Sequence, residues 1–210
     1  MHFTFQYQKN PNFPNRYISP KSLQNFLQEN LSDYITLIGT STLGEPIYQF
    51  SYGSGDIKVL AWSQMHGNES NSTHCMLDLW YSLESQPQLK EKLFQNISLD
   101  FIFMLNPDGS KVWSRRNSLD IDMNRDYLQN ASCEMKLLKE VAFSKKYDYA
   151  LNLHEQRTIF STDGKNPATL SFLAPSEDYD RTVTENRKKS MAVIASIYNV
   201  LRMQIPNQIA

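Results

Sequence analysis

Residues 57–69 have the sequence IKVLAWSQMHGNE, in which an apolar run gives way to a short polar turn. The first six residues are typical of a buried β-strand, and the polar residues with glycine after them mark its end. Functional side chains of α/β sheets collect at strand ends. We therefore take His66 and Glu69, just beyond this strand, as the first candidates for a functional site.

An imidazole and a carboxylate three residues apart can converge on one cation from a tight turn or from one helical face. A His-x-x-Glu pair also arises by chance in many proteins, so further ligands are needed. His154 directly follows a second apolar run, residues 149–153. A single histidine there is more often a core or rim residue, but with His66 and Glu69 it completes the two-histidine, one-carboxylate set that binds catalytic zinc.

The rest of the chain alternates between strand-like and helical patterns. Strands are predicted at 34–39, 47–52, 97–105, 147–153 and 169–173. Helices are predicted from Pro20, after residues 71–73, at about 133–143, and over a last segment that opens at Glu185 and contains Met191 to Leu201. This alternation predicts an α/β fold with a mixed or mostly parallel sheet.

Composition narrows the class of protein. The 210 residues suit one soluble domain, and 21 Lys+Arg against 22 Asp+Glu give no indication of a nucleic-acid partner. No apolar run reaches the roughly 18 residues of a membrane span. Cys75 and Cys133 do not form a disulfide scaffold, and the start shows no secretory signal pattern, so we expect a cytoplasmic protein without a membrane partner.

A third motif follows the strand predicted at 97–105. Residues 106–109, Asn-Pro-Asp-Gly, are a strong turn signature. Arg115, Asn124 and Arg125 come next, and arginine together with asparagine suits the binding of a carboxylate. By spacing alone, a solvated loop with ordinary arginines is the simpler interpretation.

In their order, these motifs closely resemble those of the M14 family of zinc carboxypeptidases: His-x-x-Glu, Asn-Pro-Asp-Gly, Arg, Asp-x-Asn-Arg and a later His. The resemblance runs from about residue 40 to at least 175, and residues 153–160 are similar to a bacterial branch of the family. It implies a three-layer α/β fold, a mixed and mostly parallel sheet with helices on both faces. It also implies one zinc ion per chain, bound by His66, Glu69 and His154.

The resemblance further implies hydrolysis of the C-terminal peptide bond of a peptide or amino-acid conjugate. Arg115 would polarise the scissile carbonyl and stabilise its oxyanion; its spacing to Asn124 favours it over Arg116. Asn124 and Arg125 would hold the terminal carboxylate of the substrate. Zinc would lower the pKa of its bound water from 15.7 to about 7, and a nearby carboxylate would take the water's proton.

One part of the family pattern is missing. The general base of the family is a glutamate that follows a late apolar strand, after a tyrosine that covers the substrate. Glu155, Glu177 and Glu185 are the glutamates after His154, and none follows such a strand. We therefore expect residues 1–210 to be a single zinc carboxypeptidase-like domain that lacks its C-terminal portion, with the base beyond residue 210.

Four alternatives remain open from the sequence. The chain could use an unrecognised substitute base, or it could be a zinc-dependent deacylase of N-acyl amino acids. It could also be a zinc- and carboxylate-binding module without turnover. Finally, the motifs could be coincidental.

Overall fold

The computed structural model describes residues 5–156, 161, 164–205 and 208–209. The chain divides into two compact units, Met1–Glu155 and Gln156–Ala210, and each is described by itself. The expectation of one incomplete domain over residues 1–210 stays a prediction. Residues 157–160, the second half of the bacterial-branch motif, lie outside the described residues.

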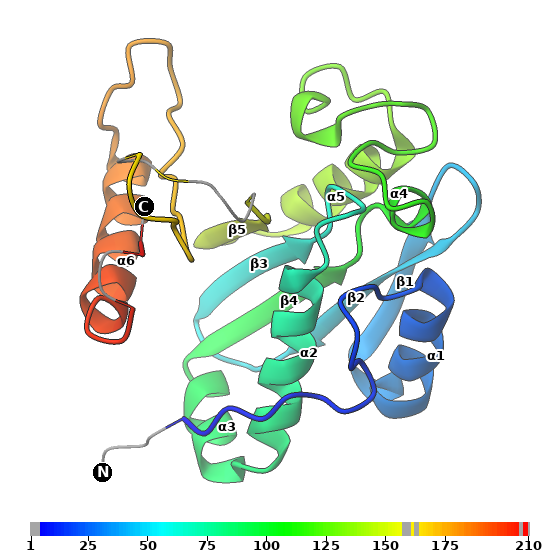
Figure 1. Ribbon diagram of the computed structural model, residues 1–210, viewed down its shortest axis with the longest axis horizontal. Coiled ribbons are helices and arrows are strands. Elements are labelled where there is room, and N and C mark those ends of the chain that lie inside the picture. Colours follow the sequence, from blue (N-terminus) through cyan, green and yellow to red (C-terminus); the bar gives the residue numbers. More distant parts are fainter. Residues whose placement is uncertain (1–4, 157–160, 162–163, 206–207, 210) are drawn as a thin grey trace. The chain divides into compact units, whose positions relative to one another are not determined.

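The first unit contains a sheet and its covering helices (Figure 1). In chain order its elements are α1 (Pro20–Asn30), the 3-10 turn η1 (Ser32–Tyr34), β1 (Ile35–Thr40), β2 (Pro46–Tyr52), β3 (Ile57–Ser63), α2 (Asn71–Glu84), α3 (Pro87–Phe94), β4 (Ile97–Phe103), α4 (Pro107–Lys111), the 3-10 turn η2 (Met123–Arg125), α5 (Cys133–Ser144) and β5 (Tyr149–Leu153).

The sheet of this unit has the strand order β1-β2-β4-β3-β5 among the described residues. β3 pairs in parallel with β4 and with β5, whereas β2 is antiparallel to both of its neighbours. The predicted mixed sheet is therefore confirmed. Because β4, β3 and β5 are parallel neighbours, the segments that follow them all leave the sheet at one edge.

Side chains on successive residues of β4 point to opposite faces of the sheet. Phe101 and Phe103 pack in a cluster with Leu27 of α1 and Trp80 of α2. Ile102, between them, packs in a second cluster with Leu138 of α5. Helices thus cover both faces, which confirms the predicted three-layer arrangement.

Three local expectations need correction. Residues 169–173 form no strand; Leu170 makes an isolated bridge to Ile209, and the N–H groups of Thr169 and Leu170 both donate to the carbonyl of Gln208. Residues 106–109 are not a simple turn, because Asn106 caps α4 and Pro107 occupies its first turn, a position that suits proline. The predicted helix after residues 71–73 already begins at Asn71.

The second unit contains one helix among its described residues, α6 (Glu185–Leu201), which confirms the helix predicted there. Thr184 caps it by accepting the N–H of Arg187 at 3.2 Å. No residue of this helix is buried. Within the described part of the chain, no helix is long and apolar enough to cross a membrane.

Asp100 of β4 is buried and fastens the segment after α5 to the sheet. Ser51 on β2 donates to its carboxylate at 2.7 Å, Lys145 contacts it at 2.7 Å, and the Tyr147 hydroxyl donates to it as well. Burial raises the pKa of Asp100, but the hydrogen bonds from Lys145, Tyr147 and Ser51 outweigh it, so the pKa lies below its ordinary value. The group is therefore ionised at neutral pH.

This carboxylate makes stability depend on pH. Its pKa is lower in the folded chain, so its contribution is fully present above the unfolded pKa of about 4 and is lost as pH falls through the folded pKa. Asp100→Asn should lower the free energy of unfolding by about 2 kcal/mol at neutral pH, the typical size for hydrogen bonds to a charged group. Urea unfolding near neutral pH and at about pH 3 measures this; an equal loss at both pH values would contradict it.

Candidate metal centre

The loop after β3 begins with a backbone conformation that turns it out of the sheet. The N–H groups of Leu105 and Asn106 donate to the carbonyls of Ser63 and Gln64 at 3.0 Å, so backbone pairing continues past the ends of strands β3 and β4. Gln64 then adopts a φ of +48°, which non-glycine residues rarely occupy. Its buried side chain holds this turn by donating to the carbonyl of Gly67 at 2.9 Å.

Gly67 stands where this loop touches α4. A Cβ atom on Gly67 would lie 2.2 Å from the carbonyl carbon of Gly109 and 2.2 Å from the nitrogen of Ser110. Both contacts are with backbone and cannot be relieved by rotating a side chain. Glycine between His66 and Glu69 thus lets the His-x-x-Glu loop pack directly against the Asn-Pro-Asp-Gly segment.

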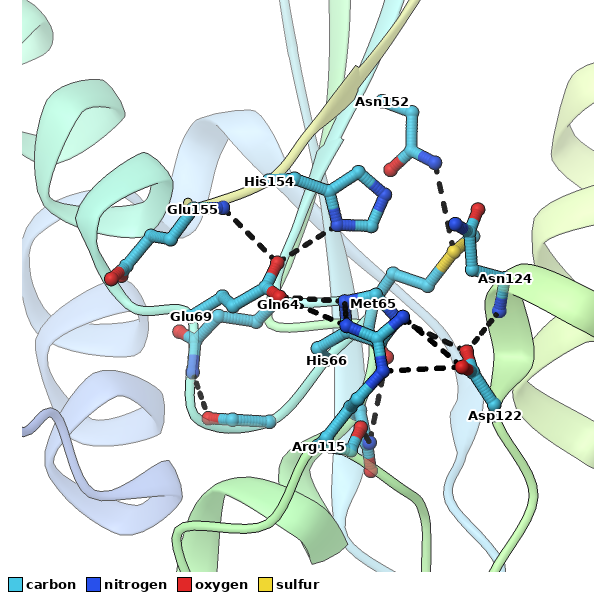
Figure 2. A network of polar contacts seen from close by, with 12 residues as sticks. Gln64, Met65, His66, Glu69, Arg115, Asp122, Asn124, Asn152, His154 and Glu155 are labelled. Carbon is cyan, nitrogen blue, oxygen red and sulfur yellow. Dashed lines mark hydrogen bonds and ion pairs between the residues drawn. The ribbon is translucent and has the colours of Figure 1, made fainter. Parts of the chain in front are cut away.

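Three predicted ligands meet at the edge where β3 and β5 end (Figure 2). His66 Nδ1 lies 2.7 Å from Glu69 Oε1, and His154 Nδ1 lies 2.8 Å from Glu69 Oε2. One ligand atom from each residue lies within 4.8 Å of the others. We call His66, Glu69 and His154 the metal triad.

Glu69 is ionised in this surrounding. Its burial alone raises its pKa, but hydrogen bonds from His154 and His66, together with the backbone N–H of Glu155, lower the pKa to about 2. A carboxylate that stays charged at every physiological pH is ready to bind a cation.

Asp122 orients the first histidine from behind. Its Oδ1 lies 3.1 Å from His66 Nε2, and its Oδ2 accepts from Arg115 Nε at 3.1 Å. Both ring nitrogens of His66 thus face a carboxylate, Nδ1 that of Glu69 and Nε2 that of Asp122. In the tautomer that donates from Nε2 to Asp122, Nδ1 is the nitrogen that is left to bind a metal. Sequence reasoning gave Asp122 no role; the signal for it was its place in the Asp-x-Asn-Arg motif.

Arg115 reaches the triad, and Arg116 does not contact it. Arg115 Nη1 donates to His66 Nδ1 at 3.0 Å and lies 3.4 Å from Glu69 Oε1. Arg116 instead donates to the carbonyl of Asp120 at 2.7 Å. The structure therefore places the arginine that the spacing favoured beside the predicted ligands.

Asn124 and Arg125 belong to η2 and are exposed. The backbone N–H of Asn124 donates to Asp122 Oδ1 at 3.0 Å. The same oxygen contacts His66, so Asp122 links Asn124 to the triad. Arg125 donates to the carbonyl of Asn124 at 3.0 Å. Among the contacts of the described residues, neither side chain touches a member of the triad.

The donor set fits zinc. Two imidazole nitrogens and one carboxylate are the ligands of catalytic zinc sites, and a carboxylate behind the ligating histidine is their usual support. In the Nε2–H form of His66, the lone pair of Nδ1 and the charged Glu69 Oε1 face each other across 2.7 Å. A cation bound by both atoms would relieve this repulsion.

The fold and the triad together define a class of protein. It is an α/β protein whose candidate metal site, of the kind found in metal-dependent hydrolases, lies at the carboxyl ends of its parallel strands. A family model described as zinc carboxypeptidase matches residues 21–159, which include all of the predicted site residues. The chain belongs to this family, the M14 metallopeptidases.

The chain is also similar to a curated protein in part of its sequence and to solved structures in its fold. Carboxypeptidase 2 of Trichophyton rubrum is 29% identical over 100 residues, which are 47% of this chain and 19% of the fungal protein. A metallo-carboxypeptidase from Burkholderia cenocepacia superposes with a TM-score of 0.68 at 17% identity, covering 92% of this chain and 52% of that chain. Carboxypeptidase A of Helicoverpa armigera gives 0.57 at 16% identity, with 68% and 46% coverage. The chain spans about half the length of these solved structures.

Asp122→Asn tests the support behind His66. We expect zinc to bind roughly 10- to 100-fold more weakly, because the asparagine amide can turn a donor toward Nε2 and no longer fixes the ring. Competition with a chromophoric chelator measures the affinity. Asp120→Asn, two residues away and exposed, should bind zinc like the unchanged chain. Equal affinities for the two variants would show that Asp122 has no such role.

Proposed function

We propose that this protein is a zinc-dependent metallocarboxypeptidase, acting on peptides with a free C-terminal carboxylate. The observation that supports it most is the convergence of His66, Glu69 and His154 within 4.8 Å, with the guanidinium of Arg115 3.0 Å from His66 Nδ1. When bound, zinc would act as a Lewis acid on the scissile carbonyl and lower the pKa of a water molecule.

Arg115 would hold the carbonyl oxygen of the scissile bond. Its guanidinium is charged at all relevant pH values and presents several N–H donors. Asp122 contacts two nitrogens of this guanidinium, Nε at 3.1 Å and Nη2 at 3.0 Å. The third nitrogen, Nη1, is the one that contacts the triad. A donor that is fixed in advance stabilises developing negative charge at little reorganisation cost.

Asn124 and Arg125 would bind the terminal carboxylate of the substrate. Both are exposed, and both leave side-chain donors available: the Asn124 contact to Asp122 uses its backbone N–H, and the Arg125 contact uses one guanidinium nitrogen. Docking the carboxylate there would bring the last peptide bond toward the triad and exclude internal bonds.

The general base is assigned to no residue of this chain. Besides Glu69, the described carboxylate that contacts the triad is Asp122, which is already bound to His66 and Arg115. The Glu155 side chain faces Arg16 and the N-terminus of α2. These contacts support a second candidate for the 210-residue chain by itself: a zinc- and carboxylate-binding module without turnover.

Incubation of the zinc-loaded chain with peptides tests both functions. Stepwise release of C-terminal amino acids, detected by mass spectrometry, supports the peptidase. Binding of the peptides without release, lost when the C-terminus is amidated, supports the binding module. Cleavage of N-acyl amino acids with no release from peptides would replace both proposals by the deacylase.

A further inference from the structure

Glu155 follows the last member of the metal triad but contacts other elements. Its backbone N–H donates to Glu69 Oε2 at 3.1 Å. Its side chain, which is 7% exposed, pairs with Arg16 Nη2 at 2.7 Å and accepts the backbone N–H of Asn71. Figure 2 shows this carboxylate pointing away from the ring of His154. One residue therefore joins the end of β5, the carboxylate of the triad and two further segments.

The contact with Asn71 fixes the far end of the loop that contains Glu69. Asn71 is the first residue of α2, and the first N–H groups of a helix have no partner within it. The capping residue, Ser70, makes no side-chain hydrogen bond to the helix. Glu155, two residues beyond the end of β5, supplies the missing acceptor, with a negative charge that the positive end of the helix dipole favours.

Arg16 is held at both its main chain and its side chain. Its carbonyl accepts from Ser70 Oγ at 2.7 Å and lies 3.0 Å from His74 Nε2. Its guanidinium lies over the ring of Trp113, 5.4 Å from the centroid. Because Arg16 precedes residue 21, it lies outside the region that the family model matches.

The segment that contains Arg16 is fastened along α2. We call residues 5–18 the N-terminal segment. The N–H groups of Gln8 and Asn10 donate to Ser82 Oγ and Asp78 Oδ1, each at 2.8 Å. These acceptors are four residues apart and so lie on one face of the helix. The position of Arg16 is therefore set by contacts that do not involve the triad.

We propose that Glu155 is a positioning residue for Glu69 and His154, and that Arg16 completes its contacts, so that the N-terminal segment strengthens metal binding in this chain. The proposal rests on the proposed zinc site. An exposed ion pair alone stabilises little, but here one partner is buried. Without Arg16, the buried Glu155 carboxylate would keep only the backbone N–H of Asn71 as a donor among the described contacts. The end of β5 would then be fixed less firmly.

Zinc affinity of the 210-residue chain, measured by competition with a chelator, gives the first test. Glu155→Gln and Arg16→Met should each weaken binding by roughly 10-fold, the lower end of the range for groups behind the ligands. The double variant should be little weaker than the worse single one, because both act through one contact. Arg16→Lys should restore most of the affinity.

The matched control is Lys111→Met, which removes the Lys111–Glu45 ion pair on the surface and should leave zinc affinity unchanged. If Arg16→Met and Glu155→Gln bind zinc as tightly as this control, the proposal is wrong. The visible spectrum of the Co²⁺-loaded protein should also change in the two variants and not in the control, since it reports ligand geometry rather than folding.

Amide hydrogen exchange in the metal-free chain separates this proposal from the zinc site itself. NMR should find the Glu155 N–H protected, and Arg16→Met should speed its exchange by about 10-fold while the Leu60 N–H within β3 is unaffected. An unprotected Glu155 N–H, or one that Arg16→Met does not change, would overturn the positioning role. If the unchanged chain bound no zinc, the proposed function would fail, and this measurement would still decide the role of Glu155.

Discussion

Glu69→Gln is expected to abolish tight zinc binding. Glu69 is the member of the triad that contacts both histidines, through separate oxygens at 2.7 and 2.8 Å. Glutamine keeps the size of the side chain but supplies one neutral oxygen in place of a charged pair. We expect the affinity to fall by more than the roughly 100-fold that loss of a group behind the ligands can cost. Chelator competition measures the loss.

A matched variant removes a carboxylate elsewhere. Glu84→Gln breaks the contact with Lys90 at the end of α2, and it should bind zinc like the unchanged chain. Circular dichroism of both variants checks that they fold. Tight zinc binding by Glu69→Gln, at the affinity of the Glu84→Gln variant, would remove Glu69 from the site.

In the proposed peptidase, Arg115→Met is expected to lower turnover by about 10²- to 10³-fold while zinc stays bound, the usual cost of removing one oxyanion donor. The kcat value should fall much more than KM rises, because the contact forms with charge that develops in the transition state. Zinc affinity should stay equal or rise. In the structure Arg115 Nη1 contacts His66 Nδ1, the atom that faces Glu69, and so competes with a cation there.

Arg116→Met is the control for this prediction. It removes a neighbouring positive charge whose contacts are with Asp120, and both kcat and zinc affinity should be unchanged. Steady-state kinetics on one peptide, with zinc content measured in parallel, compares the two variants. Loss of zinc together with activity in Arg115→Met would assign this arginine a structural role instead.

The sequence was most informative where a chemical motif directly follows an apolar run. His66 follows β3 within three residues, and His154 follows β5 at once. Two neighbouring parallel strands place such residues at one edge, so their proximity could be predicted without knowing any side-chain contact.

Contacts between distant segments could not be predicted in this way. Arg16 and Glu155 are 139 residues apart, and neither belongs to a motif that suggests a pair. Asp122 is seven residues from Arg115, but which histidine it orients depends on how its loop folds against the loop that follows β3. The strand expected at 169–173 failed for a related reason: its apolar residues fit a strand, but a strand also needs a neighbour to pair with, and the described residues provide an isolated bridge.

An anomalous difference map at the zinc absorption edge, from crystals of the zinc-loaded chain, would locate the bound metal. We expect one strong peak per chain, within coordination distance of His66 Nδ1, Glu69 and His154 Nδ1. The absence of a peak between these three residues, or a peak held by other side chains, would contradict this expectation.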